Sequence, residues 1–177
     1  MTGVGSTEPA RSGGAGLAGA GAGTALYDAI QAERAKYPEG SRSAVLPALR
    51  LAQDEHGWLS PDVMREVADA LEVTPAFVAS IATFYDQFNT EPVGEHLVEV
   101  CTNVSCALYG AQQVLESFES DLDCHAGSTS ADGKVTLRTI ECLGGCGWGT
   151  IVAVDHRYHL YVKPEDTAAI VEELRAV

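Results

Sequence analysis

Apolar residues recur at three- and four-residue intervals along residues 24–90, which is the spacing of amphipathic helices. Helices are predicted over 25–37 and 43–56, after Ser60-Pro61 and after Thr74-Pro75. The expected buried stripes are Val45, Leu49 and Ala52; Val63, Val67 and Leu71; and Phe77, Ile81, Phe84 and Phe88. The first half of the chain is therefore expected to be a small bundle of about four helices.

Hydroxyl side chains mark where three of these helices should begin. Ser60 and Thr74 each precede a proline. A Ser or Thr side chain there can accept a hydrogen bond from a free backbone N–H, and proline at the first helical position loses no bond. Ser43 is assigned the same capping role for the helix that ends near His56.

The pattern changes after the turn-forming run 89–94. Strands are predicted at 96–100, 135–139, 151–154 and 158–162, and helices at 106–118 and 164–176. The 106–118 helix should bury one side, made of Leu108, Ala111, Leu115 and Phe118. The sequence thus predicts an α+β fold, with a helical region over 24–92 and an α/β domain over 93–177. Residues 1–23, rich in glycine, are expected to form a flexible tail.

Composition excludes several classes of protein. The 177 residues include 11 Lys and Arg against 25 Asp and Glu, which gives a net charge of −14. Nucleic-acid binding needs clustered basic residues, so we expect no nucleic-acid partner. No apolar run of about 18 residues is present, so we expect no membrane insertion. The first residues lack the parts of a secretory signal, which indicates a cytoplasmic protein whose clustered cysteines bind metal more readily than they form disulfides.

Four of the five cysteines form two close pairs. Four residues separate Cys101 from Cys106, three separate Cys142 from Cys146, and 35 residues lie between the pairs. Each pair is expected where a strand ends and a loop begins, so the two loops could meet at one edge of the sheet. Four thiolates suit either a [2Fe–2S] cluster or a structural zinc ion. The wide spacing favours the broader iron pair.

The neighbours of these cysteines refine the hypothesis. Glycines follow Cys142, and their backbone N–H groups could approach cluster sulfurs and tune a reduction potential. Trp148 either packs in the core or shields the cluster from water, and Cys124 is interpreted as a bystander thiol. A thiol–disulfide enzyme is disfavoured because neither pair has the C-x-x-C spacing. The chain also lacks a glycine-rich nucleotide motif, so no hydride-transfer site of its own is expected.

Taken together, these motifs resemble the thioredoxin-like [2Fe–2S] ferredoxin family, and within it the E-type subunits of NADH-quinone oxidoreductase. The resemblance covers roughly residues 24–175 and is carried by four stretches: His56-Gly57-Trp58-Leu59-Ser60, Ala82-Thr83-Phe84-Tyr85, Val98-Glu99-Val100-Cys101-Thr102-Asn103 with Ser105-Cys106, and Glu141-Cys142-Leu143-Gly144-Gly145-Cys146. It departs from many members at Gly147-Trp148-Gly149-Thr150, where those members carry Ala-Pro or Gly-Pro.

The resemblance implies a thioredoxin-like domain with one [2Fe–2S] cluster held by Cys101, Cys106, Cys142 and Cys146. It implies no catalytic residue in this chain, which would be a non-autonomous subunit of NADH:quinone oxidoreductase (complex I). Its cluster would exchange electrons with FMN on a partner subunit that also binds NADH, alongside further iron–sulfur subunits in the peripheral arm of a membrane-associated complex. Similar modules serve NAD-linked formate dehydrogenases and hydrogenases, and these, together with a zinc scaffold, stay as alternatives.

Overall fold

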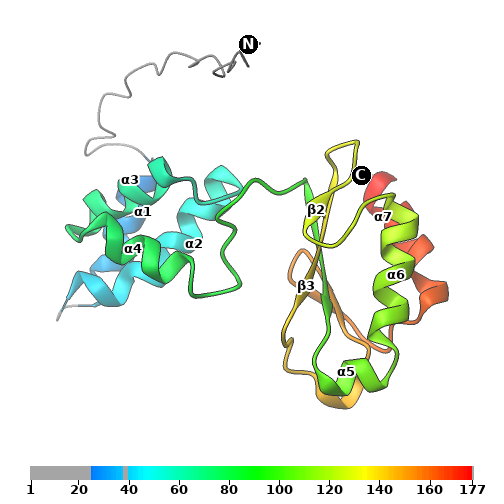
Figure 1. Ribbon diagram of the computed structural model, residues 1–177. Helices are drawn as coiled ribbons and strands as arrows, with labels where there is room; N and C mark the ends of the chain where they lie inside the picture. Colours follow the sequence, from blue (N-terminus) through cyan, green and yellow to red (C-terminus); the bar gives the residue numbers. More distant parts are fainter. Residues whose placement is uncertain (1–24, 38–39, 177) are drawn as a thin grey trace, which may run out of the picture.

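The computed structural model describes residues 25–37 and 40–176. The predicted tail over 1–23 lies outside the described residues, as do Pro38 and Glu39 of the predicted first turn. Helices α1–α4 form one part of the molecule, and a mixed sheet with α6 and α7 forms the other (Figure 1). None of the helices in the described residues has the length and hydrophobicity of a membrane-spanning segment.

The helical part has its own apolar core. It contains α1 (Ala25–Arg34), a 3-10 turn η1 (Ser41–Ala44), α2 (Val45–His56), α3 (Pro61–Leu71) and α4 (Pro75–Ala82). The side chains at its centre are fully buried: Ile30, Ala48, Leu49, Leu59, Val67 and Leu71. The predicted stripes of α2 and α3 are thus confirmed, since their burial removes apolar surface from water.

Two of the three predicted helix caps are confirmed. Ser60 Oγ accepts a hydrogen bond of 3.2 Å from Val63 N, and Thr74 Oγ1 accepts one of 3.3 Å from Phe77 N. The prediction for Ser43 is wrong. It lies inside η1, and the residue that precedes α2 is Ala44, which offers no side-chain acceptor. The 3-10 turn runs directly into α2 and replaces the expected cap.

The predicted stripe of the fourth helix is wrong beyond its first turns. Helix α4 ends at Ala82, and the face it buries is Val78 and Ala82. Phe84 lies past the end of the helix and is 75% exposed. The helical period therefore does not extend through the aromatic residues that follow α4, although Phe88 is buried from the loop.

The second part is a five-stranded mixed sheet. Its strands are β1 (His96–Cys101), β2 (Ser128–Thr129), β3 (Val135–Ile140), β4 (Val152–Val154) and β5 (Arg157–His159), in the order β2-β3-β1-β4-β5. Strands β1 and β3 are parallel, and the other pairs are antiparallel. The sequence missed the two-residue β2, which lies in a segment predicted to be a polar loop, and β5 ends before the predicted 158–162 strand does.

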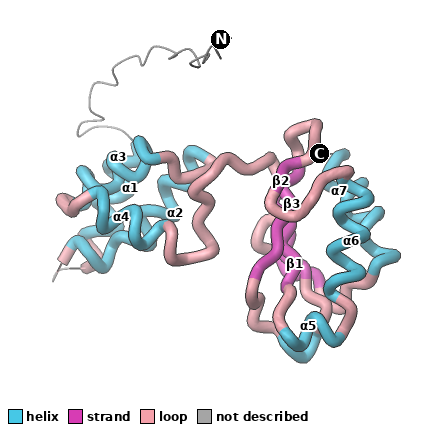
Figure 2. Tube along the Cα trace, in the orientation of Figure 1, coloured by secondary structure: helices cyan, strands magenta, loops and turns pink. Residues whose placement is uncertain are grey.

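The predicted helix over 106–118 is two helices, α5 (Val104–Leu108) and α6 (Ala111–Leu122). Gly110 separates them at φ 95°, a conformation that glycine adopts without strain. As a result Leu108 is 84% exposed and does not share the buried side of α6. Helix α6 and the last helix, α7 (Thr167–Ala176), which follows the 3-10 turn η3 (Pro164–Asp166), lie against one face of the sheet (Figures 1 and 2).

That face forms the second core. Its buried members include Val98, Val100, Phe118, Leu137, Val152 and Leu174. Residues 83–95 connect α4 to β1 without helix or strand and run between the two parts (Figure 2). A third, small cluster joins Cys101, Cys106, Ala111 and Ile151 at the carboxyl end of β1.

An ion pair on the other face of the sheet ties the two parts together. Arg138 of β3 donates to Glu99 Oε1 of β1 from Nε at 2.9 Å and from Nη2 at 2.6 Å. The same guanidinium reaches the connecting segment, where Nη1 donates to Asn89 Oδ1 at 3.1 Å and Nη2 to the Asp86 carbonyl at 2.8 Å. Strands β1 and β3, which lead to the two cysteine loops, are therefore fastened to each other and to the helical part.

Candidate metal centre

The first cysteine of each pair follows one of two parallel strands. Cys101 is the last residue of β1, and Cys142 comes two residues after β3. Cys101 pairs in register with Ile140, so the two strands end at the same edge of the sheet. The expected meeting of the two loops at one edge is confirmed.

The second cysteine of each pair begins or sits within a short helical turn. Cys106 lies in α5, whose start is capped by the Asn103 side chain accepting from Val104 N at 2.8 Å. Cys146 opens the 3-10 turn η2 (Cys146–Trp148). Each loop therefore leaves its strand and returns by a tight helical segment, as the spacing of each pair requires.

Side-chain contacts hold the two loops beside each other. Ser105 Oγ donates to the Cys146 carbonyl at 2.8 Å, and Cys101 Sγ lies 4.0 Å from the carbonyl of Glu141, the residue before Cys142. In the part of the chain that the structure describes, no group of three or more His, Cys, Asp or Glu side chains surrounds a position for a single metal ion. The four-thiolate ligand set therefore stays a prediction.

The two pairs differ in burial. Cys101 and Cys106 are 3% and 2% exposed, whereas Cys142 and Cys146 are both exposed. Burial is the largest cause that raises the pKa of the Cys106 thiol; a backbone hydrogen bond with Ile151 lowers it, and the neighbouring Cys101 and Cys146 raise it. A thiolate at Cys106 thus needs a positive charge close to it, which a coordinated metal would supply.

The glycines of the second loop have separate tasks. Gly144 has φ 76°, and its N–H donates to Cys142 Sγ at 3.3 Å. A Cβ at Gly145 would overlap Cδ1 of the buried Ile151. Four sulfur donors, with a backbone N–H directed at one of them, fit an iron–sulfur group, and the close packing of the loop on Ile151 explains why glycine is needed there.

The fifth thiol lies elsewhere. Cys124 follows α6, which begins beside α5 and runs about 18 Å along the sheet before reaching it. It packs against the core between the sheet and its helices, and burial raises its pKa.

An exposed group of apolar side chains borders the cysteine loops, and sequence reasoning missed it as a set. We call it the apolar rim; its members and their exposed fractions are Val104 71%, Leu108 84%, Tyr109 64%, Trp148 51% and Tyr161 59%. Core packing of Trp148 is thus excluded. The Tyr161 N–H donates to the Trp148 carbonyl at 3.0 Å, and the Tyr109 ring packs on Gly149. The one signal in the sequence was the four-residue spacing of Val104 and Leu108.

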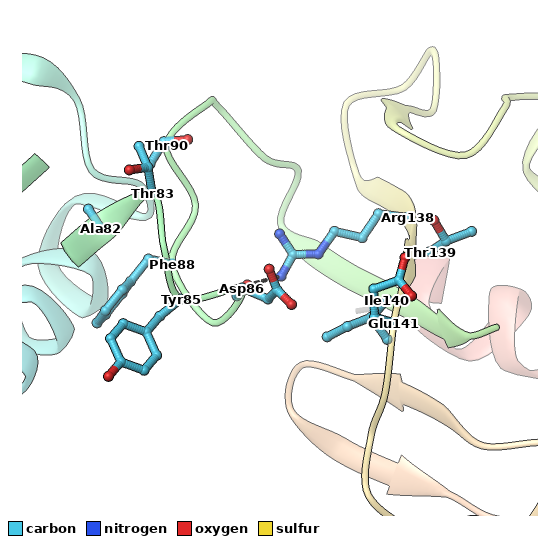
Figure 3. A pocket seen from close by; sticks show the side chains of 10 residues that line it. All are labelled: Ala82, Thr83, Tyr85, Asp86, Phe88, Thr90, Arg138, Thr139, Ile140 and Glu141. Atoms are coloured by element: carbon cyan, nitrogen blue, oxygen red, sulfur yellow. Dashed lines mark hydrogen bonds between the residues drawn. The ribbon is translucent and has the colours of Figure 1, made fainter. Parts of the chain in front are cut away.

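A cavity of about 310 Å³ opens between the segment after α4 and the end of β3. Figure 3 shows Tyr85 and Phe88 on one side and Arg138 reaching across toward Asp86. Glu141, next to Cys142, also lines the cavity. The second cysteine loop is therefore adjacent to the helical part as well as to the first loop.

The family model described as thioredoxin-like [2Fe–2S] ferredoxin matches residues 30–175, which cover most of the chain. The chain belongs to the thioredoxin-like [2Fe–2S] ferredoxin family. All four paired cysteines, the strands that lead to them and the apolar rim lie within the match to this ferredoxin family.

Curated relatives of this ferredoxin-family chain are consistently named as subunits of NADH-quinone oxidoreductase. An E-type subunit of that enzyme from Rhizobium meliloti (strain 1021) is 42% identical over 151 residues, which cover 85% of this chain and 89% of the relative. NADH-quinone oxidoreductase subunit 2 of Thermus thermophilus is 34% identical, covering 84% and 83%. The E-type subunit of Mycobacterium bovis (strain ATCC BAA-935 / AF2122/97) is 38% identical, and the match spans 80% of this chain but 56% of that longer relative.

Among solved structures, the fold resembles part of an NAD⁺-reducing [NiFe]-hydrogenase in the air-oxidised state. The TM-score is 0.66 at 20% identity, over 75% of this chain and 23% of the hydrogenase chain. Because the match covers most of the chain, it includes more than the sheet alone. The predicted α+β class, with helices preceding a thioredoxin-like ferredoxin fold, is confirmed.

Proposed function

We propose that this chain holds one [2Fe–2S] cluster on Cys101, Cys106, Cys142 and Cys146 and serves as the electron-transfer subunit of an NADH-oxidising complex of the NADH-quinone oxidoreductase type. The observation that carries the proposal is the placement of both cysteine pairs at the shared end of the parallel strands β1 and β3. The names of the relatives support the type of complex.

The chain's own residues would hold the group and control its surroundings. When bound, a [2Fe–2S] cluster accepts and returns one electron. Cys101 and Cys106 would bind from the buried side, where the protein excludes water, and Cys142 and Cys146 from the exposed side. The N–H of Gly144 would stabilise negative charge on the Cys142 sulfur, because an N–H donor beside a thiolate favours the more reduced state.

The apolar rim supports docking of a partner beside these loops. Large exposed apolar side chains gathered in one place mark protein interaction sites more often than single ones do. We propose that a flavoprotein subunit carrying FMN and the NADH site covers the rim and exchanges electrons with the cluster, with further iron–sulfur subunits in the same assembly. Docking here would also cover the exposed cysteine pair.

Anaerobic reconstitution of the full chain with ferrous iron and sulfide tests the cluster. We expect two irons and two sulfides per chain and, after reduction, a rhombic EPR signal from one unpaired electron. One zinc ion in a colourless protein would contradict the proposal and favour a zinc scaffold. Disulfide reduction by the metal-free protein, lost on a single Cys→Ser change, would contradict it in favour of a thiol-redox enzyme.

Matched variants separate the proposed ligands from the fifth thiol. Cys124→Ser should leave the iron and sulfide content unchanged, whereas Cys142→Ser should lower it. Affinity capture of the tagged chain from its own cells should recover a flavoprotein subunit. Substituting Trp148→Ala and Leu108→Ser together should weaken that capture without changing the iron content. Recovery of hydrogenase or formate dehydrogenase subunits instead would assign the module to one of those complexes.

A further inference from the structure

One side-chain hydroxyl bridges the two cysteine loops. Ser105, the residue before Cys106, donates from Oγ to the carbonyl oxygen of Cys146 at 2.8 Å. The donor comes from α5 of the first loop and the acceptor from η2 of the second. The bond therefore connects the second cysteine of one pair to the second cysteine of the other.

This bridge becomes more important once the thiols bind metal. The other side-chain contact between residues 101–109 and 141–149 in the structure runs from Cys101 Sγ to the Glu141 carbonyl at 4.0 Å. It depends on the thiol proton, which a metal-bound thiolate lacks. Within these two described segments, no backbone hydrogen bond joins one loop to the other. The Ser105 hydroxyl would then be the remaining hydrogen bond between them.

We propose that Ser105 is a positioning residue for the cluster: its hydroxyl fixes the Cys146 carbonyl against α5 and so holds the exposed cysteine at the distance the buried pair requires. This inference rests on the proposed function, since it concerns the same site. Cys146 is exposed and opens a short 3-10 turn between glycines, so its own loop offers few contacts to hold it. A bond from the packed helix α5 supplies that restraint.

The bond also acts on charge. A hydroxyl that donates to the Cys146 carbonyl withdraws electron density from a group next to a ligand sulfur. It therefore stabilises the cluster after it has taken up an electron. Loss of the hydroxyl should lower the midpoint potential, and a freer Cys146 should release the cluster faster.

The variants Ser105→Ala and Ser105→Thr test this role in the full reconstituted chain. Ser105→Ala should lower the midpoint potential measured by EPR-monitored titration, broaden the EPR signal, and raise the rate of cluster loss to a chelator roughly 10-fold, the scale of residues that orient metal ligands. Ser105→Thr keeps the hydroxyl and should restore the wild-type potential and rate. Ser80→Ala is the matched control, because Ser80 Oγ also donates to a backbone carbonyl, that of Phe77, at 2.7 Å in α4.

The outcomes are distinct. A wild-type chain without an iron–sulfur cluster overturns the proposed function and this inference together. A wild-type cluster whose potential and release rate are unchanged in Ser105→Ala overturns this inference alone. Equal loss of thermal stability in Ser105→Ala and Ser80→Ala, with an unchanged potential, would likewise reduce Ser105 to a structural residue and overturn it.

Discussion

The two cysteine loops differ in what holds them. The first runs from the end of β1 into α5, and both of its cysteines pack with Ala111 and Ile151 in a small buried cluster. The second runs from the end of β3 into η2, and both of its cysteines are exposed. Packing fixes the first loop, whereas glycine conformations and single hydrogen bonds fix the second.

This difference separates two tasks within one candidate site. A buried pair gives rigid anchors and excludes water, but burial disfavours the thiolate form of Cys106 until a metal compensates its charge. An exposed pair is accessible to a metal and to a partner, but it needs outside restraints such as Ser105. A substitution should therefore have unequal effects in the two loops.

The largest expected effect comes from removing a ligand. Cys106→Ser and Cys142→Ser should each lower the iron and sulfide content, and the buried substitution should lower it further, by at least about 10-fold, because the packed loop cannot move a serine oxygen into place. Quantitative iron and sulfide analysis after anaerobic reconstitution measures both. Equal losses in the two variants would remove the proposed difference between the loops.

The next largest effect concerns the strands that lead to the loops. The Glu99 side chain is 5% exposed and Arg138 is 24% exposed, so Arg138→Met leaves a buried carboxylate unpaired. Breaking a buried pair in this way costs about 3–5 kcal/mol. Urea denaturation should show a loss in that range, and limited proteolysis should show faster cleavage in 83–95, because Asp86 and Asn89 lose their contacts with the guanidinium.

The matched control is an ion pair on the surface of the helical part. Arg34 and Glu72 form two hydrogen bonds, of 3.1 and 3.0 Å, at a site where the Glu72 side chain is 73% exposed. Exposed pairs contribute about 0–1 kcal/mol, so Glu72→Gln should change the free energy of unfolding little. If Arg138→Met cost no more than this control, the inter-strand pair would not be what fastens the two parts.

Local chemistry explains how much of the fold the sequence could predict. Ser60 and Thr74 cap their helices because the bond involves residues only three apart, which sequence shows directly. Strand β1 was predicted from its own apolar run. The end of α4 at Ala82 and the break at Gly110 were not predicted, because the apolar pattern continues through both points while the backbone does not.

The candidate site divides in the same way. The pairing of the cysteines and their meeting at one edge follow from spacing and from the parallel order of strands, which the sequence indicated. The unequal burial of the pairs depends on Ile151 and Ala111, which lie far from Cys101 in sequence and reach it only through the fold. The apolar rim was missed for the same reason, since its members come from three separate segments.

A smaller effect should separate two glycines of the second loop. A methyl group at Gly145 would overlap Ile151 Cδ1, and overpacking of this kind costs about 1–3 kcal/mol. A methyl group at Gly147 meets no atom within 4 Å and requires no strained φ. Gly145→Ala should therefore lower the thermal midpoint while Gly147→Ala does not, and Ile151→Val in the Gly145→Ala background should restore part of the loss. Equal midpoints for the two glycine variants would contradict the close packing of this loop.

The smallest effect concerns Cys124, a half-buried thiol intermediate between the two pairs. Burial is the main cause that raises its pKa; a hydrogen bond with Ser128 lowers it, and the charges of nearby carboxylates such as Glu119 raise it. Because the folded-state pKa lies above the unfolded one, its contribution to stability is complete below the unfolded pKa and is lost as the pH rises through the folded one. In the reconstituted protein, iodoacetamide should therefore modify Cys124 slowly at neutral pH and faster at alkaline pH. Glu119→Gln should shift that rise to lower pH, and mass spectrometry of the modified peptide measures it; fast modification at neutral pH would show that Cys124 is not shielded by the core.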